Sequence, residues 1–101
     1  SRNKRLGVNC TLLSANEGGV LGLPDDRRGF RVDSFVTDSV GELAGMKVGD
    51  VMIEIAGQRV PAICTKETLV TMINSTKDNM DVPIVVLRDR KNLTLQVRWK
   101  R

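Results

Sequence analysis

Short stretches in which apolar and polar residues alternate run through this chain, and this period of two is typical of half-buried strands. The alternation is clearest at residues 6–13 and 93–99, where one side is apolar and the other is polar. Residues 29–36 and 82–87 are richer in Val, Ile and Phe, and we expect them to be more deeply buried strands. In the last segment, the pattern predicts a buried face formed by Leu93, Leu95, Val97 and Trp99.

Three hydroxyl residues stand where helices can begin. Ser14, Ser39 and Thr65 can each accept a hydrogen bond from the first-turn amides of a following helix. Glu42 stands three residues after Ser39, which is the spacing of a capping box. The helices we expect cover residues 15–21, weakened by a glycine pair, then 40–45, which is very short, and 66–75, which has an apolar face.

The segment 44–60 carries the clearest succession of signals in the chain. Gly45 ends a helix, Gly49-Asp50 turns the chain into a strand at 51–55, and Ala56-Gly57 turns it back into a second strand. Apolar residues fill the strand, and no residue in the segment has an obvious catalytic role. The segment therefore indicates the scaffold of a module that holds something and does not convert it.

These elements predict an α+β fold that is mainly β. Five to six short strands and two helices, one of them very short, favour a small, partly open β-barrel or sandwich with helices capping its ends. A chain of 101 residues has room for one domain and one core. We expect residues 6–101 to form that domain, and the basic residues 1–5 to be a leader or linker.

Composition narrows the function. The net charge is +4, but the basic residues are scattered, aromatics are 3% and tyrosine is absent, so we expect no nucleic-acid partner. No apolar run is long enough to cross a bilayer, and we expect no membrane insertion. Without histidine, the chain cannot assemble a Ser-His-Asp or Cys-His site, and Cys10 and Cys64 alone cannot complete a zinc site. We expect two buried or half-buried thiols, no cofactor, no metal and no catalytic activity in this domain.

A family resemblance rests on residues 39–57, which read Ser-Val-Gly-Glu-Leu-Ala-Gly-Met-Lys-Val-Gly-Asp-Val-Met-Ile-Glu-Ile-Ala-Gly. With this motif the chain resembles a PDZ domain over nearly its whole length, although Val40-Gly41 stands where the family commonly has Pro-Ala. The element order is similar to that of the PDZ domains beside HtrA-type serine proteases. The motifs that carry this second likeness are Leu6-Gly7-Val8, Leu21-Gly-Leu-Pro24 and Gly29-Phe-Arg-Val32.

The resemblance implies a protein-interaction module that binds the C-terminal tail of a partner by β-strand addition. The tail would lie between a strand at 8–12 and the helix at 65–75. A turn formed by Arg5, Leu6, Gly7 and Val8 would present amides to the tail carboxylate, because its glycine has no obstructing side chain. The groove residues that the resemblance implies are Asn9, Cys10, Lys66, Val70 and Ile73, with Leu6, Val8, Val70 and Ile73 forming the pocket for the last side chain.

Two alternatives stay open at this point. Val20-Leu21-Gly22-Leu23 has the same apolar-Gly-apolar pattern and could be the carboxylate loop instead, although Pro24 removes an amide from the strand that would follow. The domain could also have a structural or autoregulatory role, packing on a neighbouring domain or on its own copy without external peptide. The parent protein could be a serine protease that this domain regulates.

Overall fold

A six-stranded open sheet forms the body of the computed structural model, which describes residues 6–99. The strands pair in the order β1-β2-β3-β5-β6, β4 pairs with β3, and every pairing is antiparallel. β1 therefore ends the path of strands on one side, with an edge that is free to pair. The strands are β1 (Val8–Leu12), β2 (Phe30–Phe35), β3 (Val51–Ile55), β4 (Gln58–Arg59), β5 (Val82–Arg88) and β6 (Lys91–Val97).

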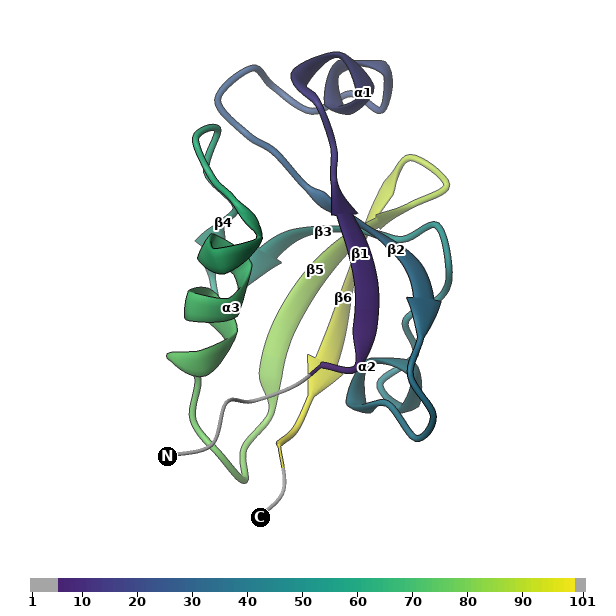
Figure 1. Ribbon diagram of the computed structural model, residues 1–101, viewed down its shortest axis with the longest axis vertical. Coiled ribbons are helices and arrows are strands. Elements are labelled where there is room, and N and C mark those ends of the chain that lie inside the picture. The colour runs from purple at the N-terminus through teal and green to yellow at the C-terminus, as the bar shows by residue number, and fades with distance from the viewer. Residues whose placement is uncertain (1–5, 100–101) are drawn as a thin grey trace.

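Within the described residues, three short helices pack around this sheet. They are α1 (Ala15–Val20), α2 (Val40–Leu43) and α3 (Lys66–Asn74). Figure 1 shows α3 beside the sheet next to β1, with α1 at the upper end of the molecule and α2 at the lower end. The α+β, mainly β fold and the open sheet agree with the prediction, and the short helix expected after Ser14 forms as α1. Residues 1–5, the predicted leader or linker, lie outside the described part.

Apolar side chains fill both faces of the sheet. In β5, Val82, Ile84 and Val86 belong to a large cluster, while Leu87 belongs to a smaller one. Because successive side chains of a strand point to opposite faces, the two clusters lie on opposite sides. The large cluster also receives the apolar face of α3, and the small one is covered by Leu21 and Leu23, which follow α1.

The β5–β6 hairpin differs from the expected pattern. Its turn has two residues, Asp89 and Arg90, both at positive φ (51° and 64°). Strand β5 therefore ends at Arg88 and β6 begins at Lys91, closer to the turn than the expected segments 82–87 and 93–99. Leu93 is 38% exposed, and the prediction that it is buried is wrong. Leu93 lies close to the hairpin tip, whereas Val97 and Trp99 belong to the large cluster.

The capping signals mostly form as expected. The Ser14 hydroxyl accepts from the amide of Glu17 (3.1 Å), and the Glu17 carboxylate accepts from the amide of Ser14 (3.0 Å), so α1 has a complete capping box. At α2 only the serine half is present, with the Ser39 hydroxyl accepting from the amide of Glu42 at 3.0 Å. These caps satisfy amides that a short helix would otherwise leave unpaired.

Asp50 connects the turn before β3 to the end of β5. Its side chain is 2% exposed and accepts hydrogen bonds from Nε of Arg88 (2.8 Å), Nη2 of Arg88 (2.7 Å) and the amide of Lys47 (2.9 Å). Burial alone raises the pKa of the Asp50 carboxyl, but the Arg88 and Lys47 hydrogen bonds outweigh it and hold that pKa below its ordinary value. The Gly-Asp motif at 49–50 is thus part of the frame.

Candidate functional site

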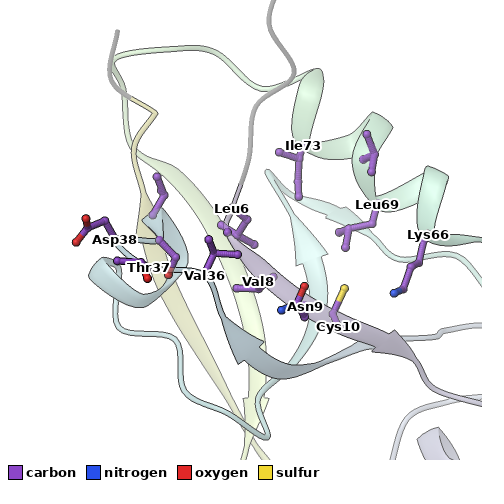
Figure 2. A pocket seen from close by; sticks show the side chains of 14 residues that line it. Leu6, Val8, Asn9, Cys10, Val36, Thr37, Asp38, Lys66, Leu69 and Ile73 are labelled. Carbon is purple, nitrogen blue, oxygen red and sulfur yellow. The ribbon is translucent and has the colours of Figure 1, made fainter.

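A groove of about 620 Å³ lies between the free edge of β1 and α3. Figure 2 shows side chains from β1 and from α3 facing one another across it. Every predicted site residue except Arg5 lines this groove, and Arg5 falls outside the described residues. The lining residues are Leu6, Gly7, Val8, Asn9, Cys10, Val36, Thr37, Asp38, Ser39, Val40, Lys66, Leu69, Val70 and Ile73.

The turn that precedes β1 directs two backbone amides away from α2. The carbonyl of Leu6 accepts from the amide of Gly41 (2.8 Å), and the carbonyl of Gly7 accepts from the amide of Val36 (2.9 Å). In a trans peptide unit, the carbonyl and the following amide point in opposite directions. The amides of Gly7 and Val8 therefore point away from the β2–α2 segment, toward the open side of the turn.

Gly7 is required at this turn for two reasons. Its φ is +76°, a left-handed conformation that residues with a Cβ adopt only under strain. A Cβ at this position would also lie 2.5 Å from Cβ of Ser39 and 3.0 Å from its Cα. The backbone of the turn thus packs directly on the N-cap of α2, and only glycine fits between them.

Two polar side chains of β1, Asn9 and Thr11, hydrogen-bond to side chains of β2. Nδ2 of Asn9 donates to Oγ of Ser34 at 2.8 Å, and the Thr11 hydroxyl donates to the Asp33 carboxylate. Arg31 Nε also donates to Asp33, at 2.9 Å. Asn9 thus lines the groove with one N–H of its side-chain amide engaged by Ser34.

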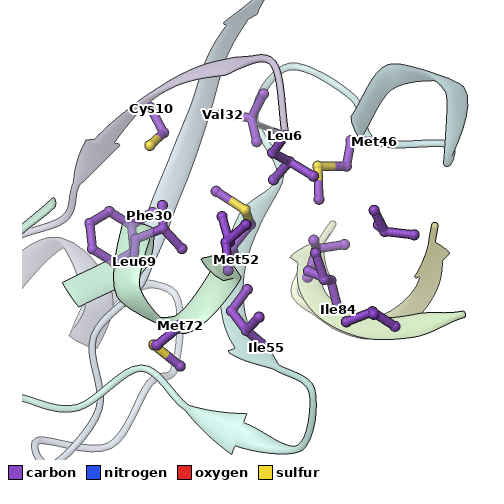
Figure 3. Packing of buried hydrophobic residues seen from close by; sticks show 14 of the residues in the cluster. Leu6, Cys10, Phe30, Val32, Met46, Met52, Ile55, Leu69, Met72 and Ile84 are labelled. Carbon is purple, nitrogen blue, oxygen red and sulfur yellow. The ribbon is translucent and has the colours of Figure 1, made fainter. Parts of the chain in front are cut away.

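The opposite wall is one face of α3. Leu69 and Ile73 are each 5% exposed, belong to the large apolar cluster and also line the groove. Figure 3 shows Leu69 and Met72 turned toward the sheet residues of that cluster. Val70 is 47% exposed, so its side chain borders the groove without supporting the core. This wall offers an apolar surface held in place by its own buried side chains.

Lys66 and Cys10 lie across the groove from each other. Cys10 is buried and free, and burial raises the pKa of its thiol, an effect that the Lys66 charge reduces and the Asp33 charge increases. Cys64 is also free and is half-buried, so the expectation of two buried or half-buried thiols is confirmed. Within residues 6–99, no carboxylate lies within ion-pair distance of Lys66. Its ammonium group is therefore available to an incoming anion.

Residues 36–40 line one end of the groove, and none of them was predicted from the sequence as a site residue. Val36, Thr37 and Asp38 come from the loop after β2, and Figure 2 shows them grouped beyond Leu6. The signal in the sequence was weak, because this loop is brought to the Gly7 turn only by the pairing of β1 with β2. Residues 20–23, the alternative carboxylate loop, lie at the end of α1 and in the following turn, and none of them lines the groove.

Over residues 6–99, no group of three or more His, Cys, Asp or Glu side chains is placed to hold a metal ion. None of the helices in that range has the length and apolar character needed to cross a membrane.

The groove lies beside the free edge of β1. The model of the PDZ domain family matches residues 1–87. The chain belongs to the PDZ family. A PDZ domain is a non-catalytic module, and this one is related to those of HtrA-type proteases.

Among curated relatives, this PDZ domain is 35% identical over 94 residues to the probable periplasmic serine endoprotease DegP-like of Rickettsia conorii (strain ATCC VR-613 / Malish 7). The match covers 93% of this chain and 18% of the relative. It is 34% identical over 91 residues to the serine endoprotease DegS of Escherichia coli (strain K12), covering 90% of this chain and 24% of that one. The chain thus spans about a fifth to a quarter of these relatives.

Solved structures with the same fold include two that were determined with peptides. The HtrA-type protease AlgWS227A with decapeptide has a TM-score of 0.77 and 25% identity, over 92% of this PDZ domain and 27% of that chain. The HtrA3 PDZ domain bound to a phage-derived ligand (FGRWV) has a TM-score of 0.71 and 14% identity, over 94% of this chain and 84% of that one. At 14% identity, the second likeness concerns the fold alone.

Proposed function

We propose that this PDZ domain binds the C-terminal tail of another polypeptide, through a free carboxylate and an apolar last residue. The observation that carries the proposal is the free edge of β1 running along a groove whose far wall is α3. A tail in extended conformation would pair with β1 as an added strand, so its backbone would be bound whatever its sequence. The tail could belong to a partner protein or to an unfolded chain.

The carboxylate would be held at the Gly7 turn. The amides of Gly7 and Val8 point away from the β2–α2 segment, since the carbonyls before them are bonded to Gly41 and Val36. Successive amides directed to one spot form an anion-binding concavity. Hydrogen bonds to a charged acceptor contribute about 1.5–3 kcal/mol each. Arg5, outside the described residues, remains part of the proposed loop as the sequence predicted.

The last side chain of the tail would enter the apolar end of the groove. Leu6, Val8, Val70 and Ile73 line this end, beside the loop after β2. Burial of a terminal Val or Leu side chain there contributes about 1.5–3 kcal/mol. The carboxylate and the side chain would therefore make contributions of similar size, and loss of either should weaken binding strongly.

Lys66 would favour an acidic side chain further back in the tail. It lines the groove at the end opposite the Gly7 turn and has no carboxylate partner among residues 6–99. Asn9, whose side-chain amide donates one N–H to Ser34, would be a polar contact to the tail on the facing strand, and Cys10 would form the groove floor.

The parent protein is a separate proposal. The curated relatives are serine endoproteases, and this chain matches about a fifth to a quarter of their length. We propose that the domain is the regulatory or substrate-reading part of such a protease. Its tail binding would then report the presence of a partner or unfolded substrate to a catalytic domain that this chain does not contain.

Titration with two peptides of the same sequence, one a free acid and one C-terminally amidated, tests the carboxylate. Each would end in Val and carry a fluorophore at its N-terminus. We expect amidation to weaken binding by at least about tenfold, which corresponds to 1.4 kcal/mol. Equal affinities of the two peptides would refute carboxylate recognition at the Gly7 turn.

Val70→Asp tests the α3 wall. Val70 is 47% exposed and borders the groove, so a charge there should weaken binding of the free acid by about tenfold or more while the domain stays folded. Val48→Asp is the matched control, since Val48 is 64% exposed and does not line the groove. Unchanged affinity for Val70→Asp would remove α3 from the site.

A structural or autoregulatory role is the second candidate. A second, shallow hollow is lined by Leu13, Val20, Leu21 and Val51, with Glu17 and Arg31 also in its lining, and Val20 is 72% exposed. An apolar surface of this kind could pack on a neighbouring domain or on a second copy. Analytical ultracentrifugation of the domain tests self-association, and a monomer at about 100 μM, far above the range of stable dimers, would exclude that form of the hypothesis.

A further inference from the structure

Arg28 connects the two walls of the groove at the end away from the Gly7 turn. Its Nε donates to the carbonyl of Leu13 at 2.7 Å, immediately after β1. Its Nη1 donates to the carbonyl of Ala62 at 3.1 Å, in the segment that leads from β4 to α3. One half-buried guanidinium therefore holds the end of the strand wall and the approach to the helix wall at the same time.

The backbone around Arg28 is itself anchored, so the side chain acts from a fixed base. The amide of Arg28 donates to the carbonyl of Val60 at 3.3 Å. The amide of Leu13 donates to the carbonyl of Gly29 at 2.9 Å. Arg28 thus sits on the backbone that joins β1, β2 and the end of β4, and the planar fork of arginine suits two acceptors at fixed positions.

The other contacts at this end of α3 are apolar: Cys64, just before the helix, packs against the large cluster, and Leu69 belongs to it. Leu69, Met72 and Ile73 bury the inner face of the helix, beginning at its fourth residue. At the start of the helix, Lys66 is exposed, and Ile63 in the preceding segment is 95% exposed. No hydrogen bond within residues 6–99 joins the first turn of α3 directly to β1. The polar link between the end of β1 and the segment before α3 is thus made by Arg28.

The width of the groove at this end matters for a strand ligand. An added strand lies about 4.8 Å from its neighbour, and side chains of the helix must reach it from the other side. A wall that moves would have to be ordered on binding, and this ordering would reduce affinity. The cost would fall on the part of the ligand that lies beside Cys10 and Lys66, and not on the part held at the Gly7 turn.

We infer that Arg28 is a positioning residue that sets the groove width at its open end and so determines how strongly tail residues beyond the last three contribute to binding. The inference rests on the proposed tail-binding function. Arg28 does not line the groove, so its effect is transmitted through Leu13 and Ala62.

The experiment compares a three-residue and a seven-residue peptide with the same free-acid ending, on the wild type and on Arg28→Met. Three extended residues span about 10 Å, and seven span about 23 Å. Arg27→Met is the matched control, because it removes the same charge from the adjacent residue, whose side chain faces Glu54 on β3 at 3.7 Å. Arg28→Lys is a second variant, since a single ammonium cannot reproduce the planar two-acceptor fork.

We expect Arg28→Met to weaken the seven-residue peptide by about three- to tenfold and the three-residue peptide by less than about twofold. Arg28→Lys should fall in between, and Arg27→Met should leave the ratio of the two affinities unchanged. An equal effect on both peptides, or none on either, would overturn the inference while leaving tail binding intact. If the wild type bound neither peptide, the proposed function would fail and the inference with it.

Amide hydrogen exchange gives a readout that does not need a ligand. In the folded Arg28→Met domain, the amide of Thr68, which donates to the carbonyl of Thr65 at 3.0 Å, and the amides of the second turn of α3 should exchange at least about threefold faster than in the wild type, while those of β3 and β5 keep their protection. Exchange raised by the same factor throughout the domain would indicate a global loss of stability and would contradict a positioning role.

Discussion

The buried carboxylate of Asp50 offers a quantitative test of how the frame around the groove is held. Replacement by Asn keeps the size and shape of the side chain and removes its charge. In the wild type, the Asp50 side chain is 2% exposed and accepts three hydrogen bonds, two from Arg88 and one from the amide of Lys47. Asn has one amide oxygen, so at least one of these donors loses its acceptor.

The magnitude follows from the burial of the two partners. Removing one member of a buried ion pair costs about 3–5 kcal/mol when the other charge is left without compensation. The Arg88 side chain is 24% exposed and can partly rehydrate, so we expect a loss of about 2–3 kcal/mol in the free energy of unfolding. With a urea m-value of about 1.3 kcal/mol per M, the midpoint should fall by about 2 M.

The pH dependence of stability distinguishes the effect of the Asp50 charge from the effect of the side-chain shape. The pKa of Asp50 is held below its ordinary value because hydrogen bonds from Arg88 and Lys47 outweigh the opposing effect of burial. A lowered pKa means that the stabilisation is fully present above the unfolded-state pKa of about 3.9. It is lost as the pH falls through the lower, folded-state pKa. The difference in stability between wild type and Asp50→Asn should therefore be constant from pH 7 to about pH 5 and narrow below pH 4.

Urea unfolding followed by tryptophan fluorescence measures this difference, since the single tryptophan, Trp99, is 6% exposed in the folded domain. Asp81→Asn is the control: Asp81 is exposed, with one hydrogen bond from Arg98 at 3.1 Å, and its replacement should cost less than about 0.5 kcal/mol. The reasoning is refuted if Asp50→Asn costs no more than the control, or if its cost is the same at pH 3 as at pH 7.

Three further changes have expected outcomes. Gly7→Ala should lower the free energy of unfolding by about 2–4 kcal/mol and weaken tail binding, because the added Cβ would lie 2.5 Å from Cβ of Ser39 and the backbone φ at residue 7 is +76°. Chemical denaturation measures the loss of stability, and peptide titration measures the loss of binding. Ala56→Asn should stabilise the domain by about 0.5–1 kcal/mol in the same denaturation assay, because Ala56 has a φ of +51° in its hairpin turn. Cys10 should react with iodoacetamide at pH 8 about tenfold more slowly than Cys64, as read by mass spectrometry, because burial raises the pKa of its thiol and blocks access.

Each of these outcomes has a result that would contradict it. A Gly7→Ala domain with wild-type stability would mean that the turn can move away from Ser39. A destabilised Ala56→Asn domain would show that backbone strain at Ala56 does not limit the stability of the domain. For Cys10, labelling as fast as that of Cys64 would mean that the groove floor is open to solvent, and a bound tail should slow labelling of Cys10 further if it covers that floor.

Much of the fold could be predicted because its signals are local. The alternation in residues 8–12, the turn at Ala56-Gly57 and the hydroxyl at Ser14 each act within a few residues, and each has the expected structure. The exception in β6 is instructive. Leu93 has the same alternating pattern as Val97, but the pattern cannot tell where along a strand the covering layer ends.

The candidate site was predictable only where a family resemblance assigned it. The pattern of residues 6–10 and 66–73 indicates a strand and a helix, and the structure places the two as opposite walls of one groove. The loop at 36–40, which closes one end, was missed because no local signal connects it with the Gly7 turn. Gly41 was visible only as a departure from the usual Pro-Ala, whereas its amide in fact bonds the carbonyl of Leu6.

Short stretches of this sequence thus determine its strands, turns and helix starts, because φ preferences and side-chain periodicity depend on near neighbours. The groove depends on contacts between distant residues. Arg28 reaches Leu13 across 15 positions and Ala62 across 34, and Asp50 reaches Arg88 across 38. Such contacts form only after the strands have paired, so their geometry was decided by the tertiary structure, which brings the free edge of β1 and the exposed face of α3 to the same space.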